Sequence, residues 1–121
     1  MPLRVGTDLV EVERLQGVIS RQGERFLQRV YTPAELEECA HSLPSLAARW
    51  AAKEAVAKAL GTGIGPVAFR EIEVRRGPLR EPVLHLHGHA AALAKQLGLT
   101  EWAISLSHTK NYAVAVVTAM G

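Results

Sequence analysis

The sequence predicts an α+β fold in which an antiparallel sheet packs against one long buried helix and several shorter helices. One observation is that helix-like and strand-like segments fall in blocks along the chain instead of alternating one by one. Another is that residues 102–108 and 112–118, both strand-like, are joined by a link short enough for a hairpin. Finally, a length of 121 residues, with 48% hydrophobic and 21% charged residues, suits a single domain spanning residues 1–121.

The first quarter of the chain is predicted to form a strand and two helices. Residues 3–10 alternate between apolar and polar side chains and predict a strand, in which Gly6 indicates a bulge or a close backbone approach. Helical spacing of apolar side chains predicts a helix over residues 11–19, and another is expected over residues 21–30. A basic stripe on the 21–30 helix would consist of Arg21, Arg25 and Arg29. The buried side of that helix would consist of Phe26, Leu27 and Val30.

Two helices with clear start signals are expected next. Thr32, Pro33 and Glu35 form a capping box with proline in the first turn, so a short helix should run to about residue 40. A longer helix should begin at residue 44 or 45 and end at residue 60, because Gly61 suits the left-handed conformation that ends a helix. A tight loop over residues 61–66 should follow.

The second half of the chain is predicted to form four strands with one helix inserted among them. Residues 68–75 and 82–86 predict two strands, with a turn over residues 76–81 around a Gly-Pro pair. An alanine-rich helix is expected over residues 88–97, closed by Gly98. The strands 102–108 and 112–118 complete the predicted sheet.

Composition excludes several classes of protein. The balance of 14 Lys and Arg against 12 Asp and Glu gives a net charge of +2, too small to indicate a nucleic-acid partner. The single cysteine, Cys39, excludes an internal disulfide framework and a thiolate zinc cluster. Neither a signal-peptide pattern nor an apolar run of about 20 residues is present, so we expect a cytoplasmic protein with no membrane segment.

The helix over residues 45–60 carries the first candidate site. It is apolar on nearly every side, yet it contains Arg49, Lys53, Glu54 and Lys58, and buried charges need a partner or a ligand. Glu54 and Lys58 share a face, and the alternative is an ordinary surface ion pair. Gly61 and Gly63 lie just beyond Lys58 and would let the backbone approach a phosphate.

Asp8 and the histidines supply further candidates. Asp8 is the only aspartate; paired with Glu54 it would make a two-carboxylate Mg²⁺ site, and the alternative is a helix N-cap. His108, at a strand end, would contact phosphate or shuttle a proton, unless it is a solvated hairpin residue. His85 and His87 would share a strand face and suggest zinc, but incidental histidines are favoured because no thiolate accompanies them.

Four segments in this order resemble the holo-acyl-carrier-protein synthases, the small 4′-phosphopantetheinyl transferases of fatty acid synthesis. They are VGTDLVEVERL, RFLQRVYTPAEL, AARWAAKEAVAKALGTGIG and ISLSHTKNYAVAVV, which together span nearly the whole chain. The resemblance implies the fold of that family and a Mg²⁺-dependent reaction. In it, coenzyme A donates its phosphopantetheine arm to a serine of acyl carrier protein and releases adenosine 3′,5′-bisphosphate.

The resemblance also implies roles for residues that match the family motifs. Asp8 and Glu54 would bind Mg²⁺, and Lys58 would contact the phosphates and stabilise charge on the departing bisphosphate. The coenzyme A site would include Arg49, Lys58, Gly61, Gly63, Pro82 and His108. The docking surface for the acidic carrier would consist of Arg14, Arg21, Arg25, Phe26 and Arg29. The proton of the carrier serine would pass either to a water near Asp8 or to Glu54, and the sequence does not distinguish these two groups.

The family is typically a homotrimer with active sites shared between neighbouring subunits. This chain has His41 and Ser42 where many members carry Lys or Arg, so the 3′-phosphate would be held by His41 or Arg49. It also has Arg80-Glu81-Pro82 where many members have Gly-Lys-Pro. Two other functions fit the residues alone: a Mg²⁺-dependent phosphohydrolase that uses Asp8 and Glu54, and a non-enzymatic module that binds an acidic protein.

Overall fold

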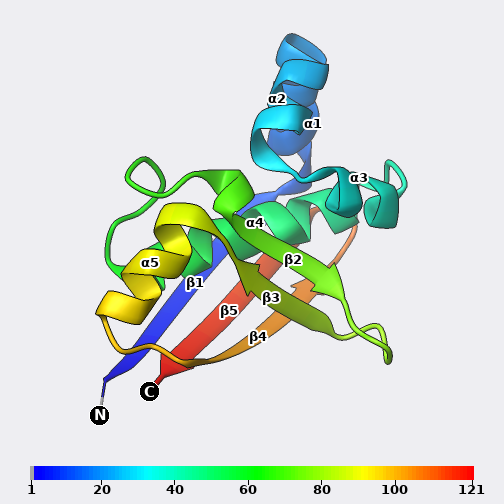
Figure 1. Ribbon diagram of the computed structural model, residues 1–121. Coiled ribbons are helices and arrows are strands. Elements are labelled where there is room, and N and C mark those ends of the chain that lie inside the picture. The colour runs from blue at the N-terminus through cyan, green and yellow to red at the C-terminus, as the bar shows by residue number, and fades with distance from the viewer. Residues whose placement is uncertain (1) are drawn as a thin grey trace.

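Two antiparallel sheets and the long helix α4 form the body of the protein, from which α1 and α2 project (Figure 1). The computed structural model describes residues 2–121. The helices are α1 (Val12–Gln22), α2 (Glu24–Val30), α3 (Pro33–Cys39), α4 (Leu43–Leu60) and α5 (Gly88–Gln96). The strands are β1 (Leu3–Glu11), β2 (Ile72–Arg76), β3 (Pro82–Leu86), β4 (Glu101–His108) and β5 (Tyr112–Met120). The predicted α+β class, with antiparallel pairing and one long buried helix, is confirmed.

The larger sheet has the order β1-β5-β4, and the smaller sheet pairs β2 with β3. β5 pairs along its whole length with β1, from Leu3 opposite Met120 to Glu11 opposite Tyr112. The predicted hairpin is present, because β4 and β5 pair antiparallel up to His108 opposite Ala113. The last strand in sequence therefore lies between the first strand and β4, and the two ends of the chain lie close together (Figure 1).

Helix α4 packs on one face of the larger sheet through small residues. Its alanines at positions 51, 52, 55 and 59 are completely buried. A methyl group added to Gly6 of β1 would lie 2.9 Å from the Ala55 carbonyl carbon and closer still to the carbonyl oxygen. The sequence therefore predicted the close approach at Gly6 correctly, whereas the register of β1 is continuous and contains no bulge.

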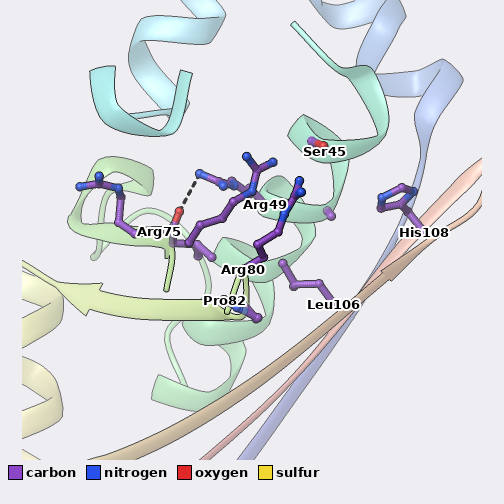
Figure 2. Close-up of a pocket in the computed structure, with 10 residues that line it drawn as sticks. Ser45, Arg49, Arg75, Arg80, Pro82, Leu106 and His108 are labelled. Atoms are coloured by element: carbon purple, nitrogen blue, oxygen red, sulfur yellow. Dashed lines mark hydrogen bonds between the residues drawn. The ribbon is translucent and has the colours of Figure 1, made fainter. Parts of the chain in front are cut away.

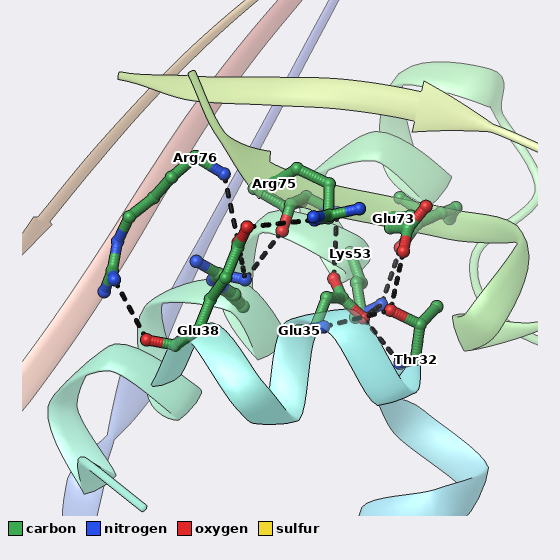
Figure 3. Close-up of polar contacts among 10 residues, drawn as sticks. Thr32, Glu35, Glu38, Lys53, Glu73, Arg75 and Arg76 are labelled. Atoms are coloured by element: carbon green, nitrogen blue, oxygen red, sulfur yellow. Dashed lines mark hydrogen bonds and ion pairs between the residues drawn. The ribbon is translucent and has the colours of Figure 1, made fainter. Parts of the chain in front are cut away.

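A buried ion pair joins α3 to α4 (Figure 3). Lys53 and Glu35 are both 0% exposed, and Lys53 Nζ lies 2.8 Å from Glu35 Oε1. Lys53 Nζ also donates to the carbonyl oxygens of Phe69 and Ile72, at 3.1 and 2.6 Å. Burial lowers the pKa of Lys53, and the negative charge of Glu35 opposes that change. The buried charge expected on this helix is therefore satisfied by the protein itself.

Four local predictions need correction. The expected 21–30 helix is broken at Gly23, which has φ of 59°, so Arg21 belongs to α1 and Arg25 and Arg29 to α2. Asp8 is not an N-cap, because β1 continues to Glu11 and α1 begins only at Val12. Residues 69–71 of the expected 68–75 strand form a 3₁₀ turn. The helix predicted to close at residue 97 ends at Gln96.

The capping box at Thr32 and the end of α4 at Gly61 are as predicted. Over residues 2–121, no helix has the length and apolar character needed to cross a bilayer.

Candidate functional site

Asp8, Glu54 and Lys58 meet where β1 crosses α4. Lys58 Nζ donates to Asp8 Oδ1 at 3.1 Å and to the Thr7 carbonyl oxygen at 2.9 Å. Glu54 lies about one turn before Lys58 on α4. Among residues 2–121 no ion pair joins Glu54 to Lys58, so the simple surface pair considered from the sequence is not formed. The lysine instead connects the helix to the strand that carries Asp8.

The ionisation of Glu54 reflects this arrangement. Burial and the nearby Asp8 carboxylate raise the pKa of Glu54, whereas the positive charges of Lys58 and Arg14 oppose that increase. Two neighbouring carboxylates are suited to share a divalent cation, and their oxygens are the ligands that Mg²⁺ prefers. No cluster of three or more His, Cys, Asp or Glu side chains occurs within residues 2–121. The donor set thus fits a cation that takes two protein carboxylates and completes its coordination with water and substrate.

A cavity of about 230 Å³ lies beside the first half of α4 (Figure 2). Its lining includes Arg49, Arg75, Arg76, Arg80, Pro82 and His108. The structure therefore brings together Arg49, Pro82 and His108, which the sequence singled out. It adds three arginines that the sequence analysis missed. Four guanidinium groups around one cavity are suited to bind a phosphate group.

The signal for the added arginines is present in the segment VRRGPLR, which was read only as a strand end and a turn. Pairing of β2 with β3 places Arg76 opposite Pro82, and the turn between them carries Arg80. The three arginines therefore gather at one end of a short two-stranded ribbon. Alternation within the strand alone does not reveal this, because the turn determines where the third arginine lies.

Helix α4 separates the cavity from the two carboxylates. Arg49 and Lys58 are about two and a half turns apart and so project from opposite sides of the helix. Asp8 and Leu106, a residue that lines the cavity, both pair with Ala115, from opposite sides of β5. Ala115 is completely buried, in the strand on which α4 packs. The residues predicted to bind coenzyme A therefore form two groups within one chain.

The glycine turn after α4 belongs to the group that contains Lys58. Gly61 and Gly63 have φ of 86° and 67°, and the Gly61 N–H donates to the Lys58 carbonyl oxygen at 3.0 Å. Neither glycine lines the arginine-rich cavity. His41 lies elsewhere as well, beside Leu36 and Leu46 in a separate groove.

The arginines predicted to dock a carrier lie on the two projecting helices. Arg14, Arg21, Arg25 and Arg29 are all exposed. The Arg14 guanidinium lies over the Trp50 ring, 5.7 Å from its centroid, and the Arg29 guanidinium lies over Phe26 at 5.8 Å. Phe26 itself is only 2% exposed and meets Trp50 edge-on, so it is a core residue and not part of an accessible surface.

One histidine of the tract, His87, is hydrogen-bonded to a carboxylate of β2. His87 Nε2 lies 3.0 Å from Glu73 Oε1, and Glu73 also accepts a hydrogen bond from the Thr32 hydroxyl at 2.7 Å. Glu73 therefore joins the second sheet to the start of α3 and also holds His87.

Comparison with known sequences points to one family. The sequence profile of the 4′-phosphopantetheinyl transferase superfamily matches residues 4–117. A holo-[acyl-carrier-protein] synthase from Herpetosiphon aurantiacus is 48% identical, over 98% of this chain and 99% of its own. The protein of the same name from Gloeobacter violaceus is also 48% identical, over 98% of this chain and 92% of its own.

Solved structures agree with the sequence comparison. The crystal structure of Helicobacter pylori holo-[acyl-carrier-protein] synthase in complex with coenzyme A superposes with a TM-score of 0.88. It is 30% identical and covers 96% of this chain and 99% of its own. The corresponding enzyme of Neisseria meningitidis gives a TM-score of 0.89 at 34% identity, with 98% of each chain covered.

Proposed function

Because the chain belongs to the 4′-phosphopantetheinyl transferase superfamily, we propose that it converts apo to holo acyl carrier protein. Coenzyme A would donate its phosphopantetheine arm to a carrier serine in a Mg²⁺-dependent reaction that releases adenosine 3′,5′-bisphosphate. We expect the reaction to serve fatty acid biosynthesis in the cytoplasm. The observation that carries the proposal is the meeting of Asp8, Glu54 and Lys58 at the crossing of β1 and α4.

Asp8 and Glu54 are the residues that would hold Mg²⁺. When bound, the metal ion supplies positive charge that offsets the pyrophosphate of coenzyme A. Lys58 supplements it: its side chain is 51% exposed, and it is held beside Asp8 by two hydrogen bonds. An ammonium group in that position stabilises the charge that develops on the departing bisphosphate.

The reaction needs a route for one proton. The serine oxygen attacks the phosphorus next to the pantetheine, and the bond from that phosphorus to the bridging oxygen breaks. The bridging oxygen leaves with the electron pair as part of adenosine 3′,5′-bisphosphate. Two groups at the carboxylate site are candidates to receive the serine proton, Glu54 itself and a water near Asp8. Burial and Asp8 raise the pKa of Glu54, but a Mg²⁺ ion held by this carboxylate would lower it, so the shift does not choose between the two.

The arginine-rich cavity is suited to the other end of coenzyme A. We propose that Arg49, Arg75, Arg76 and Arg80 hold the 3′-phosphate and that Pro82 and His108 line the nucleotide site. This removes the need for His41, which does not line the cavity. The Lys or Arg that many family members carry before α4 would be replaced here by arginines from β2 and the following turn.

Two copies of the chain would then be needed for each molecule of coenzyme A. The carboxylates and the cavity lie on opposite flanks of α4, so one copy would supply Asp8, Glu54 and Lys58 and its neighbour the cavity. The outer face of the larger sheet offers a surface for association. Exposed apolar side chains on it include Leu3, Val5, Leu9, Val116 and Met120. An apolar face of this kind marks an interface, and we propose a homotrimer with shared active sites.

A mass measurement on a carrier tests the proposed reaction. An apo acyl carrier protein incubated with coenzyme A, Mg²⁺ and this protein should gain the mass of one phosphopantetheine. E54Q and D8N should each lower the rate of that gain by about 10³ or more, and E13Q, which removes an exposed charge on α1, should not. Hydrolysis of the nucleotide without transfer would instead support the phosphohydrolase, and normal rates in E54Q and D8N would refute the metal-binding assignment.

Mixing two inactive variants tests the shared site. Arg80→Glu alters the cavity, and E54Q alters the carboxylate pair. When the two variants are co-expressed, some shared sites should combine the unaltered carboxylates of an Arg80→Glu chain with the unaltered cavity of an E54Q chain. For random assembly, about one site in four should be intact, and activity should recover to that fraction of the unaltered protein. If both groups served the same site from one chain, the mixture would stay inactive.

The exposed arginines of α1 and α2 form the proposed docking surface for an acidic carrier helix. Arg14→Glu and Arg21→Glu should raise KM for the carrier and leave KM for coenzyme A nearly unchanged. Lys95→Glu, on α5, is the matched charge reversal away from this surface and should change neither value. Weaker coenzyme A binding in the Arg14 or Arg21 variant would contradict this division of roles.

A further inference from the structure

Glu38, near the end of α3, is surrounded by arginines that line the cavity (Figure 3). Its Oε1 accepts from Arg49 Nη1 at 3.0 Å and from the Arg76 backbone N–H at 3.1 Å. Its Oε2 accepts from Arg75 Nε at 3.0 Å, and its backbone carbonyl accepts from Arg76 Nη1 at 2.9 Å. A single glutamate thus contacts three of the four arginines of the cavity.

These contacts leave part of each guanidinium group free. Arg49 is 4% exposed, and its Nη1 donates to Glu38 and, at 2.8 Å, to the Val74 carbonyl oxygen. Within residues 2–121, Nε and Nη2 of Arg49 have no hydrogen-bond partner, and neither do Nη1 and Nη2 of Arg75. Glu38 therefore fixes one nitrogen of Arg49 and one of Arg75 and leaves the other donors available to an anion in the cavity.

We infer that Glu38 is a positioning residue that holds the arginines in the arrangement that binds the 3′-phosphate of coenzyme A, an inference that rests on the proposed function. Glu38 would not touch the substrate itself. Arginine side chains have many rotamers, and ordering them when the ligand binds costs affinity. A carboxylate that orders them beforehand removes that cost, and Arg–carboxylate pairs are well suited to this because their hydrogen bonds are directional.

The sign of the effect distinguishes positioning from simple electrostatics. Glu38 carries a negative charge beside an anion site, so its charge alone disfavours phosphate, and its removal should strengthen binding. Positioning predicts the opposite. In E38Q the amide oxygen still accepts a hydrogen bond from one arginine. The NH₂ group that replaces the other oxygen cannot accept, so either Arg49 or Arg75 loses its hydrogen bond to residue 38. We expect the affinity for adenosine 3′,5′-bisphosphate to fall about tenfold.

Titration calorimetry with two nucleotides measures this directly. Adenosine 3′,5′-bisphosphate carries the 3′-phosphate and adenosine 5′-monophosphate lacks it, so only the first should bind less tightly to E38Q. KM for coenzyme A in the carrier assay should rise by the same factor, with kcat nearly unchanged. E37Q removes the neighbouring exposed charge from the same helix, and it should alter neither nucleotide affinity. E38D keeps the charge but shortens the side chain, and it should also weaken binding of the bisphosphate.

Several results would overturn the inference. They are equal or tighter binding of the bisphosphate to E38Q, an equal loss for both nucleotides, or unaltered binding to E38D. If E38Q does not fold, as judged by its circular dichroism, the E38D measurement decides alone. Failure of the proposed function appears separately, as the absence of phosphopantetheine transfer by the unaltered protein.

Discussion

Replacing Gly6 by alanine should separate the two elements that bring Asp8 and Glu54 together. Gly6 lies two residues before Asp8 on the same face of β1, and Ala55 follows Glu54 on α4. A methyl group on residue 6 would point into the backbone of α4 at Ala55. Both partners are main-chain segments within regular elements, so no side-chain rotation can relieve the contact.

The size of the displacement follows from the structure. The added carbon would lie 2.9 Å from the Ala55 carbonyl carbon, and ordinary contacts lie at 3.4–4 Å. The carbonyl oxygen lies closer still, so the strand and helix must move apart by more than about 1 Å, and overpacking of this kind costs about 1–3 kcal/mol. For a chain of this length the midpoint of thermal unfolding should fall by roughly 4–12 °C. A misplacement near 1 Å at a reacting centre also lowers the rate by up to about 10².

Two measurements on Gly6→Ala test this reasoning. Thermal unfolding followed by circular dichroism gives the loss of stability, and the mass gain of the carrier at saturating coenzyme A gives kcat. Gly17→Ala is the matched control. Gly17 lies inside α1, where a methyl group meets only the tip of the Arg21 side chain, at 3.3 Å. Gly17→Ala should leave kcat unchanged and stabilise the protein by about 0.5–1 kcal/mol, because alanine favours a helix more than glycine does.

An unfolding midpoint of Gly6→Ala equal to that of the unaltered protein would refute the close approach. A lower midpoint with unchanged kcat would show that the contact supports the fold but not the spacing of the two carboxylates.

Three further changes test other parts of the structure. Lys53→Met should destabilise the protein by about 3–5 kcal/mol in urea unfolding, because it leaves the Glu35 carboxylate buried without its cation; an unchanged midpoint would contradict the buried pair. Burial raises the pKa of Glu38, but hydrogen bonds from Arg76, Arg75 and Arg49 outweigh it and hold that pKa below its ordinary value of 4.5. The carboxylate therefore stabilises the fold above about pH 4.5. At pH 7 the unfolding midpoint of E38Q should be lower than that of the unaltered protein, and the difference between the two midpoints should disappear as the pH drops below 4.5. Val5 is 67% exposed on the outer face of the larger sheet, so Val5→Lys should place a charge in the proposed interface. Sedimentation equilibrium of this variant should give the 13.1 kDa monomer, and a trimer would place the interface elsewhere.

Elements whose signals are local could be predicted from the sequence. The capping box at Thr32 and the glycine after residue 60 bound their helices closely, since a cap depends on residues within one turn. The break at Gly23 was missed because apolar spacing continues on both sides of it, and Phe26 and Val30 are buried as expected. Helical spacing alone does not show a single residue with positive φ.

Contacts between distant segments could not be predicted in the same way. The sequence indicated that α4 carries charges needing partners, but the partner of Lys53 is Glu35, 18 residues away, and that of Lys58 is Asp8, 50 residues away. Asp8 and Glu54 were paired because Mg²⁺ prefers carboxylate ligands and because both match family motifs, and their spacing in the sequence does not indicate the pairing. The arginines of β2 were missed because their shared environment depends on Glu38, from a helix distant in sequence.

The charged residues of α4 show how one helix can serve two ends of a long substrate. Lys53 faces α3 and is neutralised inside the protein, so it contributes to the fold and not to binding. Arg49 faces the cavity and Lys58 faces β1, on opposite sides of the same helix. Between these two sides the helix is packed against the larger sheet, with its alanines at positions 51, 52, 55 and 59 completely buried. In the proposed reaction the two sites therefore meet on one coenzyme A molecule only if the cavity of one copy lies beside the carboxylates of its neighbour, so that catalysis depends on assembly.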